Sequence, residues 1–186
     1  IQTCESFRDI LRSTEQRVRG DQRWFDVVEH INCKNRFMET ADALGVPVPL
    51  TRRFARVADI GPADIARGPY PCYLKAAVSV SGVGIYRCED SAALRAALQR
   101  YEPDTPVQLQ EEVATDVFLN LQYAAEEAGL CRYAATEQVL EGCVHHGNRF
   151  PARCEPWDCV EPMARWLHAR GMRGVFAFDV AVVEGG

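Results

Sequence analysis

Lysine is almost absent from this sequence. It occurs only at Lys34 and Lys75, and all the others of the 21 basic residues are arginine. Arginine carries a planar guanidinium that forms paired hydrogen bonds, whereas the lysine ammonium is a compact point charge. So strong a bias toward arginine indicates that lysine is kept only where a compact positive charge is required. The survival of two lysines by chance is the alternative, and their surroundings must decide between the two.

Other absences exclude whole classes of protein. The net charge of −5 argues against nucleic acid as a partner, because phosphate contacts favour a basic surface. No apolar run approaches the ~20 residues of a membrane span. Residues 1–12 mix charged and apolar side chains in a way that a signal peptide does not. The eight cysteines form no C-x-x-C pair, which is typical of a reducing compartment. We therefore expect a cytoplasmic protein that binds neither nucleic acid nor a membrane.

Several familiar site motifs are missing or wrongly spaced. A P-loop and a protein kinase both place their glycines before the lysine, and a kinase also needs an H-R-D sequence, which this chain lacks. The G-x-G-x-x-G of dinucleotide-binding folds is absent. Segment 143–159 carries residue types that could bind zinc, but their spacing does not fit known closed sites. Those residues are Cys143, His145, His146, Cys154 and Cys159.

The pattern of apolar, glycine and proline residues predicts an α+β protein. Asn32 is expected to cap a helix that Gly45 ends, and Asp90 or Ser91 to cap a later one. The expected elements are helices over 6–18, 21–31 and 32–44, a loop to 71, strands over 72–78 and up to 88, a helix ending before 103, strands over 107–113, 117–124 and 130–140, a polar loop over 142–156, a helix over 158–170 and a strand over 175–183. This order predicts two lobes that meet near residues 104–112.

Lys75 lies in the middle of an apolar strand. Burying an ammonium there is costly without an anionic partner. Four residues later a Ser/Gly turn begins, over residues 79–84, and its glycines allow backbone N–H groups to converge on an anion. The combination predicts a phosphate cradle. The alternative is a lysine that reaches solvent from an edge strand beside a plain hairpin.

Asp179 lies in the last predicted strand. Alternation places it on one face with small apolar residues, and a carboxylate in such surroundings needs a cation. The residues sharing that face are Val175, Ala177, Ala181 and Val183. The cation would be a metal ion or, as the alternative, an arginine in a purely structural pair.

Five segments, in the order of the chain, resemble the ATP-grasp family, in which two α+β lobes clamp ATP between them. The resemblance covers roughly residues 33–184. The segments are 32–38 with 43–49 (the lysine-bearing helix and its Gly-Val-Pro-Val-Pro exit), 73–84 (the second lysine and the phosphate-covering loop), 108–113 (the hinge that reads adenine), 136–151 (a stretch seen in amino-acid and peptide ligases) and 176–181 (the strand with the first metal carboxylate). Both lysines of the chain fall on the family's two phosphate lysines.

The resemblance implies a site for ATP and Mg²⁺ in a cleft between the lobes. Lys34 and Lys75 would neutralise the α- and β-phosphates, with Lys75 as the catalytic lysine. The loop that would close over the triphosphate contains Ser79, Ser81, Gly82, Val83 and Gly84. Glu111, Glu112 and Val113 would meet the adenine edge, largely through backbone groups. Asp116 would bind the ribose and Asp179 the magnesium ion.

The resemblance further implies a two-lobed ATP-grasp module with antiparallel sheets. It divides the chain into N-terminal helices (1–33), a first lobe (34–107) and a second lobe (108–186). The reaction would join a small-molecule carboxylate to an amine through an acylphosphate. The region around His145, His146, Asn148 and Arg149 is the candidate substrate region, with an inert surface loop as the equal alternative. Two other classes stay open, namely a nucleotide-binding module without turnover, such as half of a split assembly, and a plain interaction domain.

The sequence departs from the family in two places. Asp116 stands where the family usually has a glutamate for the ribose, and the Glu-x-Asn metal pair expected on the strand after Asp179 would fall beyond Gly186. We therefore expect these 186 residues to bind nucleotide weakly and without turnover. An extension by about 15–20 native residues, enough for a returning strand, should restore magnesium-dependent binding. Without that strand, the last strand would present an open edge to another copy or to a partner chain.

Overall fold

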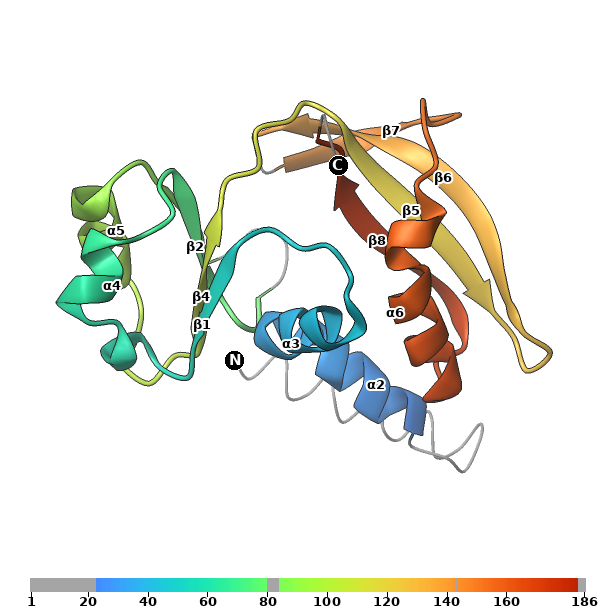
Figure 1. Ribbon diagram of the computed structural model, residues 1–186, viewed down its shortest axis with the longest axis horizontal. Helices are drawn as coiled ribbons and strands as arrows, with labels where there is room; N and C mark the ends of the chain where they lie inside the picture. The colour runs from blue at the N-terminus through green and yellow to red at the C-terminus, as the bar shows by residue number, and fades with distance from the viewer. Residues whose placement is uncertain (1–22, 80–83, 143, 184–186) are drawn as a thin grey trace.

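The computed structural model describes residues 23–79, 84–142 and 144–183, and it contains two four-stranded antiparallel sheets (Figure 1). The first has the order β1-β4-β2-β3, with β1 Thr51–Phe54, β4 Val107–Glu111, β2 Cys72–Ala76 and β3 Ile85–Cys88. The second has the order β7-β6-β5-β8, with β7 Val144–Arg149, β6 Leu130–Glu141, β5 Phe118–Ala125 and β8 Gly174–Ala181. The predicted α+β class with antiparallel sheets is confirmed.

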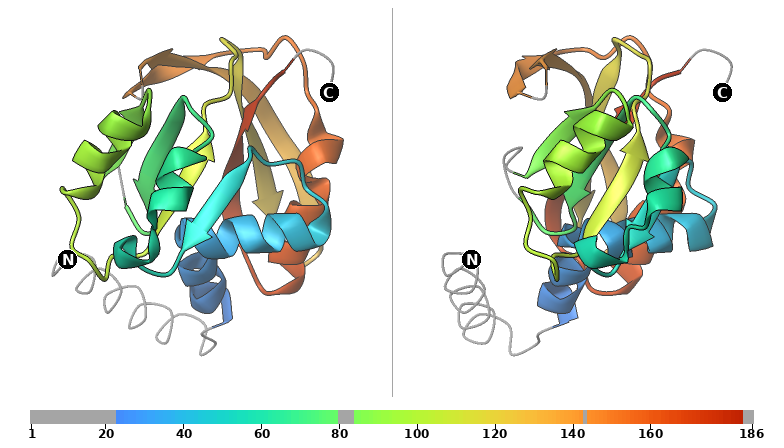
Figure 2. Two further views of the ribbon diagram at one scale, coloured as in Figure 1. Left: turned by 60° about the vertical axis from the view of Figure 1, so that its left-hand side comes forward. Right: turned by 90° about the vertical axis from the view of Figure 1, so that its left-hand side faces the viewer.

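Helices cover one face of the first sheet. These are α4 Pro62–Ala66 and α5 Ser91–Leu98, preceded by the short 3-10 helix η1 Val57–Asp59 (Figures 1 and 2). Alternation along β2 and β4 directs Leu74 and Leu109 into this helix-covered core, where both are fully buried with Leu94 of α5. Asp90 caps α5, as predicted, because its carboxylate accepts hydrogen bonds from the backbone N–H groups of Ala92 and Ala93 at 2.9 and 2.8 Å.

The second core lies between the second sheet and three helices, α2 Arg23–Asn32, α3 Lys34–Leu44 and α6 Trp157–Ala169. Leu119, Leu121 and Tyr123 alternate along β5 and point into it. Ala41 of α3 is fully buried in the same cluster, and α3 also contacts β1 and β4 of the first sheet. Helix α3 therefore joins the two sheets at the base of the molecule (Figure 1).

The end of α3 follows the prediction, but its start does not. Gly45 ends the helix in the left-handed conformation, with φ of 67°, and the N–H of Val46 reaches back to the carbonyl of Ala41 at 2.9 Å. Asn32, the predicted cap, belongs to α2, and Cys33 is the N-cap without a side-chain hydrogen bond. A single residue separates the two helices, too short a break to show in the apolar pattern.

Two predicted loops are wrong. Residues 45–71 contain β1, η1 and α4, and residues 142–156 contain β7. Both missed strands lie at the edge of a sheet and carry few apolar residues, so they show no hydrophobic alternation. The start of α4 carried a local signal, because Pro62 is its first residue and Asp64 accepts from the N–H of Gly61 at 3.0 Å.

Three further expectations concern the limits of the elements. The helix over 6–18 lies outside the described residues. β4 is hydrogen-bonded within the first sheet, and the three-part division of the chain stays a prediction. β8 pairs only with β5 among the described strands, and the open edge expected for it stays a prediction. No helix in the described ranges is long and apolar enough to cross a membrane.

Candidate functional site

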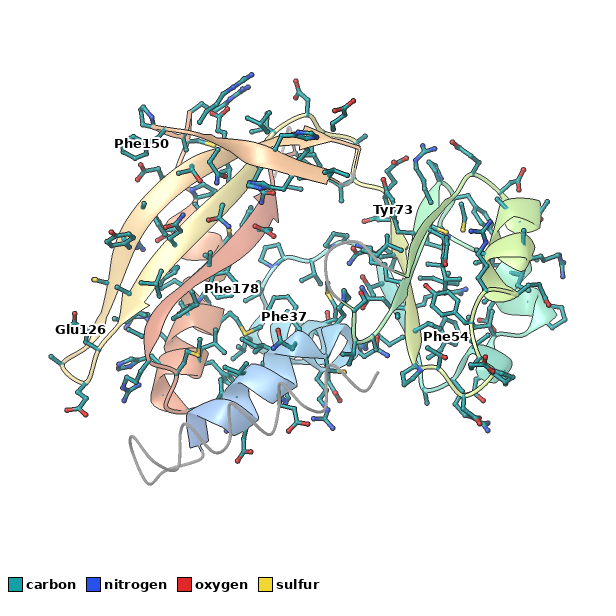
Figure 3. All side chains as sticks on the ribbon, turned by 180° about the vertical axis from the view of Figure 1, so that it is seen from behind. Phe37, Phe54, Tyr73, Glu126, Phe150 and Phe178 are labelled. Carbon is teal, nitrogen blue, oxygen red and sulfur yellow. The ribbon has the colours of Figure 1, made fainter. Side chains whose placement is uncertain are left out.

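Lys75 lies on the face of the first sheet that α4 and α5 do not cover. Tyr73 and Lys75 alternate with the buried Cys72 and Leu74 along β2. Figure 3 shows Tyr73 on the side turned toward the second sheet, with Phe54 on the opposite, helix-covered side. The Lys75 ammonium donates to Oε1 of Gln110 at 2.5 Å and lies 5.4 Å from the centre of the Tyr73 ring. The first sheet therefore holds this lysine toward the second.

Lys34 is the first residue of α3 and is bonded to the same hairpin. Its ammonium donates to Oγ of Ser79 at 2.8 Å and to the Ser79 carbonyl at 3.3 Å. Its backbone N–H donates to the carbonyl of Ala77 at 2.7 Å. Burial lowers the pKa of Lys34, because the charged ammonium loses part of its hydration. The structure thus brings Lys34 to the segment that directly follows the strand of Lys75, the other predicted phosphate lysine.

The loop between β2 and β3 is described only at its two ends. Ser79 contacts Lys34, and Gly84 has φ of 69°, a left-handed conformation that suits glycine. The Gly84 carbonyl accepts from the N–H of Ala76 at 3.1 Å and from the hydroxyl of Tyr101 at 2.5 Å. The other predicted loop residues, Ser81, Gly82 and Val83, lie outside the described residues.

The segment after β4 has its side chains engaged by neighbouring elements. The Glu111 carboxylate accepts from the N–H of Leu50 at 2.7 Å. Glu112 accepts from Nε and an Nη of Arg87, both at 2.6 Å, and from the Tyr73 hydroxyl at 3.0 Å. The hydrogen bonds from Arg87 lower the pKa of Glu112, since they favour the charged form. The backbone N–H groups of Glu111 and Glu112 also donate, to the carbonyls of Leu50 at 3.0 Å and of Pro71 at 2.9 Å. A ligand would therefore meet other backbone groups of this segment, such as the N–H of Val113, whose role stays a prediction.

Asp179 has different surroundings from those expected. It is exposed on β8, and its Oδ1 accepts from Nδ2 of Asn120 at 2.9 Å and from Nε2 of Gln138 at 2.5 Å. The surroundings of Asp179 are thus polar and exposed where apolar ones were expected, and its role as a metal ligand stays a prediction. Phe178, its neighbour along the strand, fills the core, and alternation leaves Asp179 on the polar face. Asp116 is exposed before β5, and its ribose role stays a prediction.

The other described residues that could bind a metal ion do not form a cluster either. In the described ranges, no three His, Cys, Asp or Glu side chains lie close enough together to hold a metal ion. His145 and His146 are exposed on β7, with His146 3.3 Å from Glu141, and Cys154 and Cys159 are free. Cys143 lies outside the described residues.

Sequence reasoning missed the residues that hold the predicted ones. They are Thr51, Arg87, Gln110, Asn120 and Gln138. Arg87, Gln110 and Asn120 alternate with apolar residues inside β3, β4 and β5, and that alternation was a visible signal. Thr51 lies in a segment predicted to be a loop, so no pattern pointed to it.

No family model matches the sequence, and no curated protein matches it either. Solved structures do match. The biotin carboxylase domain of 2-oxoglutarate carboxylase from Hydrogenobacter thermophilus, in complex with MgADP, ADP and bicarbonate, gives a TM-score of 0.70 at 17% identity, over 87% of this chain and 39% of that one. N5-carboxyaminoimidazole synthase from Aspergillus clavatus, in complex with ADP and 5-aminoimidazole ribonucleotide, gives 0.65 at 20% identity, over 86% and 43%.

D-alanyl-alanine synthetase A from Vibrio cholerae gives a TM-score of 0.63 at 17% identity, over 86% of this chain and 53% of that one. These proteins share one fold. This chain has the ATP-grasp fold. It spans between about two fifths and about half of the length of the ATP-grasp proteins named above.

The contact between Arg87 and Glu112 predicts a pH-dependent stability. In Arg87→Met, the pKa of Glu112 should rise toward its ordinary value of 4.5. Because the folded-state pKa is depressed in the wild type, the stabilisation is present above pH 4.5 and is lost as the pH falls through the folded-state value. Urea unfolding should therefore separate the two proteins at pH 7 and much less at pH 3.

Arg87 also pairs with the carboxylate of Glu89, so the control for this experiment is the double variant Glu89→Gln/Glu112→Gln, which removes both titrating partners. Arg87→Met in that background should change stability equally at both pH values. An NMR titration of the Glu112 carboxylate measures the pKa directly, and an unchanged pKa in Arg87→Met would contradict the assignment.

Proposed function

We propose that this chain is the ATP-binding module of an ATP-grasp enzyme that uses ATP to activate a carboxylate for attack by an amine. The observation that carries the proposal is the hydrogen bond from Lys34 to Ser79, four residues after Lys75. It draws the two lysines of the chain, from a helix and from a strand, to one Ser/Gly loop. If the two lysines had been kept by chance, there would be no reason for Lys34 to bind the loop that follows Lys75.

The residues fit a phosphate group. The described partners of the Lys34 ammonium are two neutral oxygens of Ser79, so its charge is not neutralised by them. Burial already disfavours the charged form, and a nearby anion would reverse that penalty. Lys75 is held by the neutral carbonyl of Gln110. Both ammonium groups thus suit the α- and β-phosphates of a nucleotide, and the loop over 79–84 would supply backbone N–H groups.

The hinge fits an adenine ring. Strand β4 ends at Glu111, and Glu112 and Val113 continue toward the second sheet. The side chains of Glu111 and Glu112 are engaged with Leu50, Arg87 and Tyr73, and their backbone N–H groups donate to the carbonyls of Leu50 and Pro71. We therefore infer that the base is read by the remaining backbone groups, the N–H of Val113 and the carbonyl of Glu112. Such groups are rigid when the side chains on either side are fixed, and rigidity lowers the ordering cost of binding.

Asp179 fits one ligand position of a magnesium ion. Mg²⁺ prefers six oxygen ligands and usually takes one or two carboxylates together with substrate phosphates and water. Asn120 and Gln138 orient the Asp179 carboxylate through their N–H groups and leave its net charge unchanged. When bound, Mg²⁺ would neutralise charge that develops on the transferring phosphoryl group. Asp179 would then contribute to metal affinity chiefly when a nucleotide is present.

The substrate class is proposed from the kinds of enzyme that share the fold. They include a biotin carboxylase crystallised with bicarbonate, a D-alanyl-alanine synthetase, and an L-amino acid ligase from Bacillus licheniformis. Their names point to carboxyl groups that become joined to nitrogen. We propose the same class here, with an acylphosphate as intermediate, and β7 with His145, His146, Asn148 and Arg149 as the substrate region.

A second candidate is a nucleotide-binding module without turnover, either regulatory or half of a split assembly. It is favoured because Asp179 belongs to no group of three or more potential metal ligands in the described ranges. Such a module would bind nucleotide yet release no phosphate with any carboxylate and amine. Measuring phosphate release beside binding separates the two candidates.

Nucleotide should stabilise the folded chain. ATP or ADP with magnesium should raise the melting temperature, since a ligand that binds only the folded state adds RT ln(1 + [L]/Kd) to its stability. Lys75→Met should weaken binding by about 2–4 kcal/mol, the range for removing one partner of a desolvated charge pair. Lys75→Arg should fail almost as badly, because a planar guanidinium cannot replace the compact ammonium.

Arg67→Met is the matched control, since it removes one exposed positive charge at the end of α4, the helix that covers the face of the first sheet opposite Lys75. It should bind nucleotide like the wild type. The proposed function is wrong if millimolar ATP leaves the wild-type melting temperature unchanged. Wild-type affinity in Lys75→Arg would show that the lysine itself has no role.

Asp179→Asn should separate metal binding from nucleotide binding. The asparagine keeps the size of the side chain but lacks the charge that Mg²⁺ requires. We expect ADP affinity without magnesium to change little and the gain on adding magnesium to shrink several-fold. Calorimetric titrations with and without the metal measure both quantities. An unchanged gain in Asp179→Asn would remove Asp179 from the metal site.

A further inference from the structure

The carboxamide of Gln110 has only one orientation that satisfies its neighbours. The Thr51 hydroxyl donates its single proton to the carbonyl of Pro49 at 2.7 Å. Its oxygen can therefore only accept, and it accepts from Nε2 of Gln110 at 3.0 Å. The carbonyl Oε1 of Gln110 then points away from Thr51 and receives the Lys75 ammonium at 2.5 Å. A chain of hydrogen bonds thus runs from Pro49 through Thr51 and Gln110 to Lys75.

This chain also sets the direction of the lysine. In the register of β2 and β4, Lys75 stands directly opposite Gln108, and Tyr73 stands opposite Gln110. The bond to Gln110 is therefore diagonal and draws the ammonium along β4 toward Glu111. Gln108 stands directly opposite Lys75, yet its buried Oε1 has no hydrogen-bond partner among the described residues. The ammonium is directed to the carboxamide whose orientation Thr51 fixes.

The neutral character of Gln110 matters as much as its position. A lysine side chain carries about 2 kcal/mol of rotamer entropy, and a residue ordered before binding loses less of it when a ligand arrives. A glutamate in place of Gln110 would bind the lysine but would offer no N–H to Thr51 and would cancel the charge of the ammonium. A carboxamide accepts from the ammonium, donates to Thr51 and carries no charge of its own.

We propose that Thr51 and Gln110 are positioning residues, a relay of uncharged groups that holds Lys75 in a fixed direction for the phosphates of the nucleotide. The relay rests on the proposed function, since it acts only through a lysine that binds phosphate. It extends the site to the Val-Pro-Val-Pro exit of α3, whose last residue, Pro49, supplies the first acceptor.

The first test compares Thr51→Val with Thr51→Ser, and ADP with adenosine. Valine keeps the shape of threonine but removes the hydroxyl, so the Gln110 carboxamide is no longer oriented. ADP affinity should fall about threefold to tenfold, the effect of one net hydrogen bond, while adenosine affinity stays within twofold. Thr51→Ser keeps the hydroxyl and should restore ADP affinity. A merely structural role would weaken both ligands alike and would leave their ratio unchanged.

The second test uses the charge. Gln110→Glu should lower ADP affinity more than tenfold without lowering the melting temperature of the nucleotide-free protein, because the new carboxylate pairs with Lys75. Gln99→Glu, which adds the same charge at an exposed glutamine, should bind ADP like the wild type. Gln110→Met, of similar size and without polar atoms, covers the case in which the glutamate variant does not fold. It should show the loss of ADP affinity with unchanged adenosine affinity.

The outcomes separate the relay from the proposed function. If the wild type binds no ADP with magnesium, the proposed function and the relay are both overturned. If the wild type binds ADP while Thr51→Val and Gln110→Glu keep its ADP-to-adenosine affinity ratio, the relay alone is overturned. Calorimetry for ADP and ligand-observed NMR for the weaker adenosine give the two affinities for each variant.

Discussion

Helix α3 is anchored in the second core by Ala41, and its first residue is bonded to the hairpin of the first sheet. The backbone N–H of Lys34 reaches the carbonyl of Ala77, and its ammonium reaches Ser79. These bonds come from one residue at the start of a helix, so they fix both where the helix begins and where the loop after β2 starts. The relative position of the two sheets at the candidate site depends on this connection together with two others of α3, from Asn35 to the carbonyls of Phe54 and Val107 and from Asp42 to Arg53.

Two kinds of partner hold the charged groups of the site. Glu112 is held by an arginine, which lowers its pKa and fixes it as a structural part of the hinge. The described hydrogen bonds of Lys34 and Asp179 come from neutral groups, the hydroxyl and carbonyl of Ser79 for the first and two carboxamides for the second. An ion pair would compensate these two charges within the protein. A neutral partner orients the group and leaves its field available to a ligand.

Local signals predicted the parts of the fold that depend on neighbouring residues. Gly45 ends α3 and Asp90 caps α5 because both act within a few residues of the chain. β1 and β7 were missed because both are short and mostly polar, so their sequences lack hydrophobic alternation. Lys34 and Lys75 stood out by composition alone, since the rest of the basic residues are arginine.

The holding residues could not be predicted in this way, and the reason is geometric. Thr51 meets Gln110 only because β1 pairs with β4 in the register that places them opposite each other. Asn120 meets Asp179 only through the register of β5 with β8. A shift by one residue would turn every one of these side chains to the other face of its sheet. Register is set by the cores, through Leu109 beneath the first sheet and Leu121 beneath the second, so the site's polar partners are chosen by apolar packing on the opposite face. The polar partners of the candidate site lie on one face of each sheet, and their arrangement therefore depends on the stability of the core on the opposite face of that sheet.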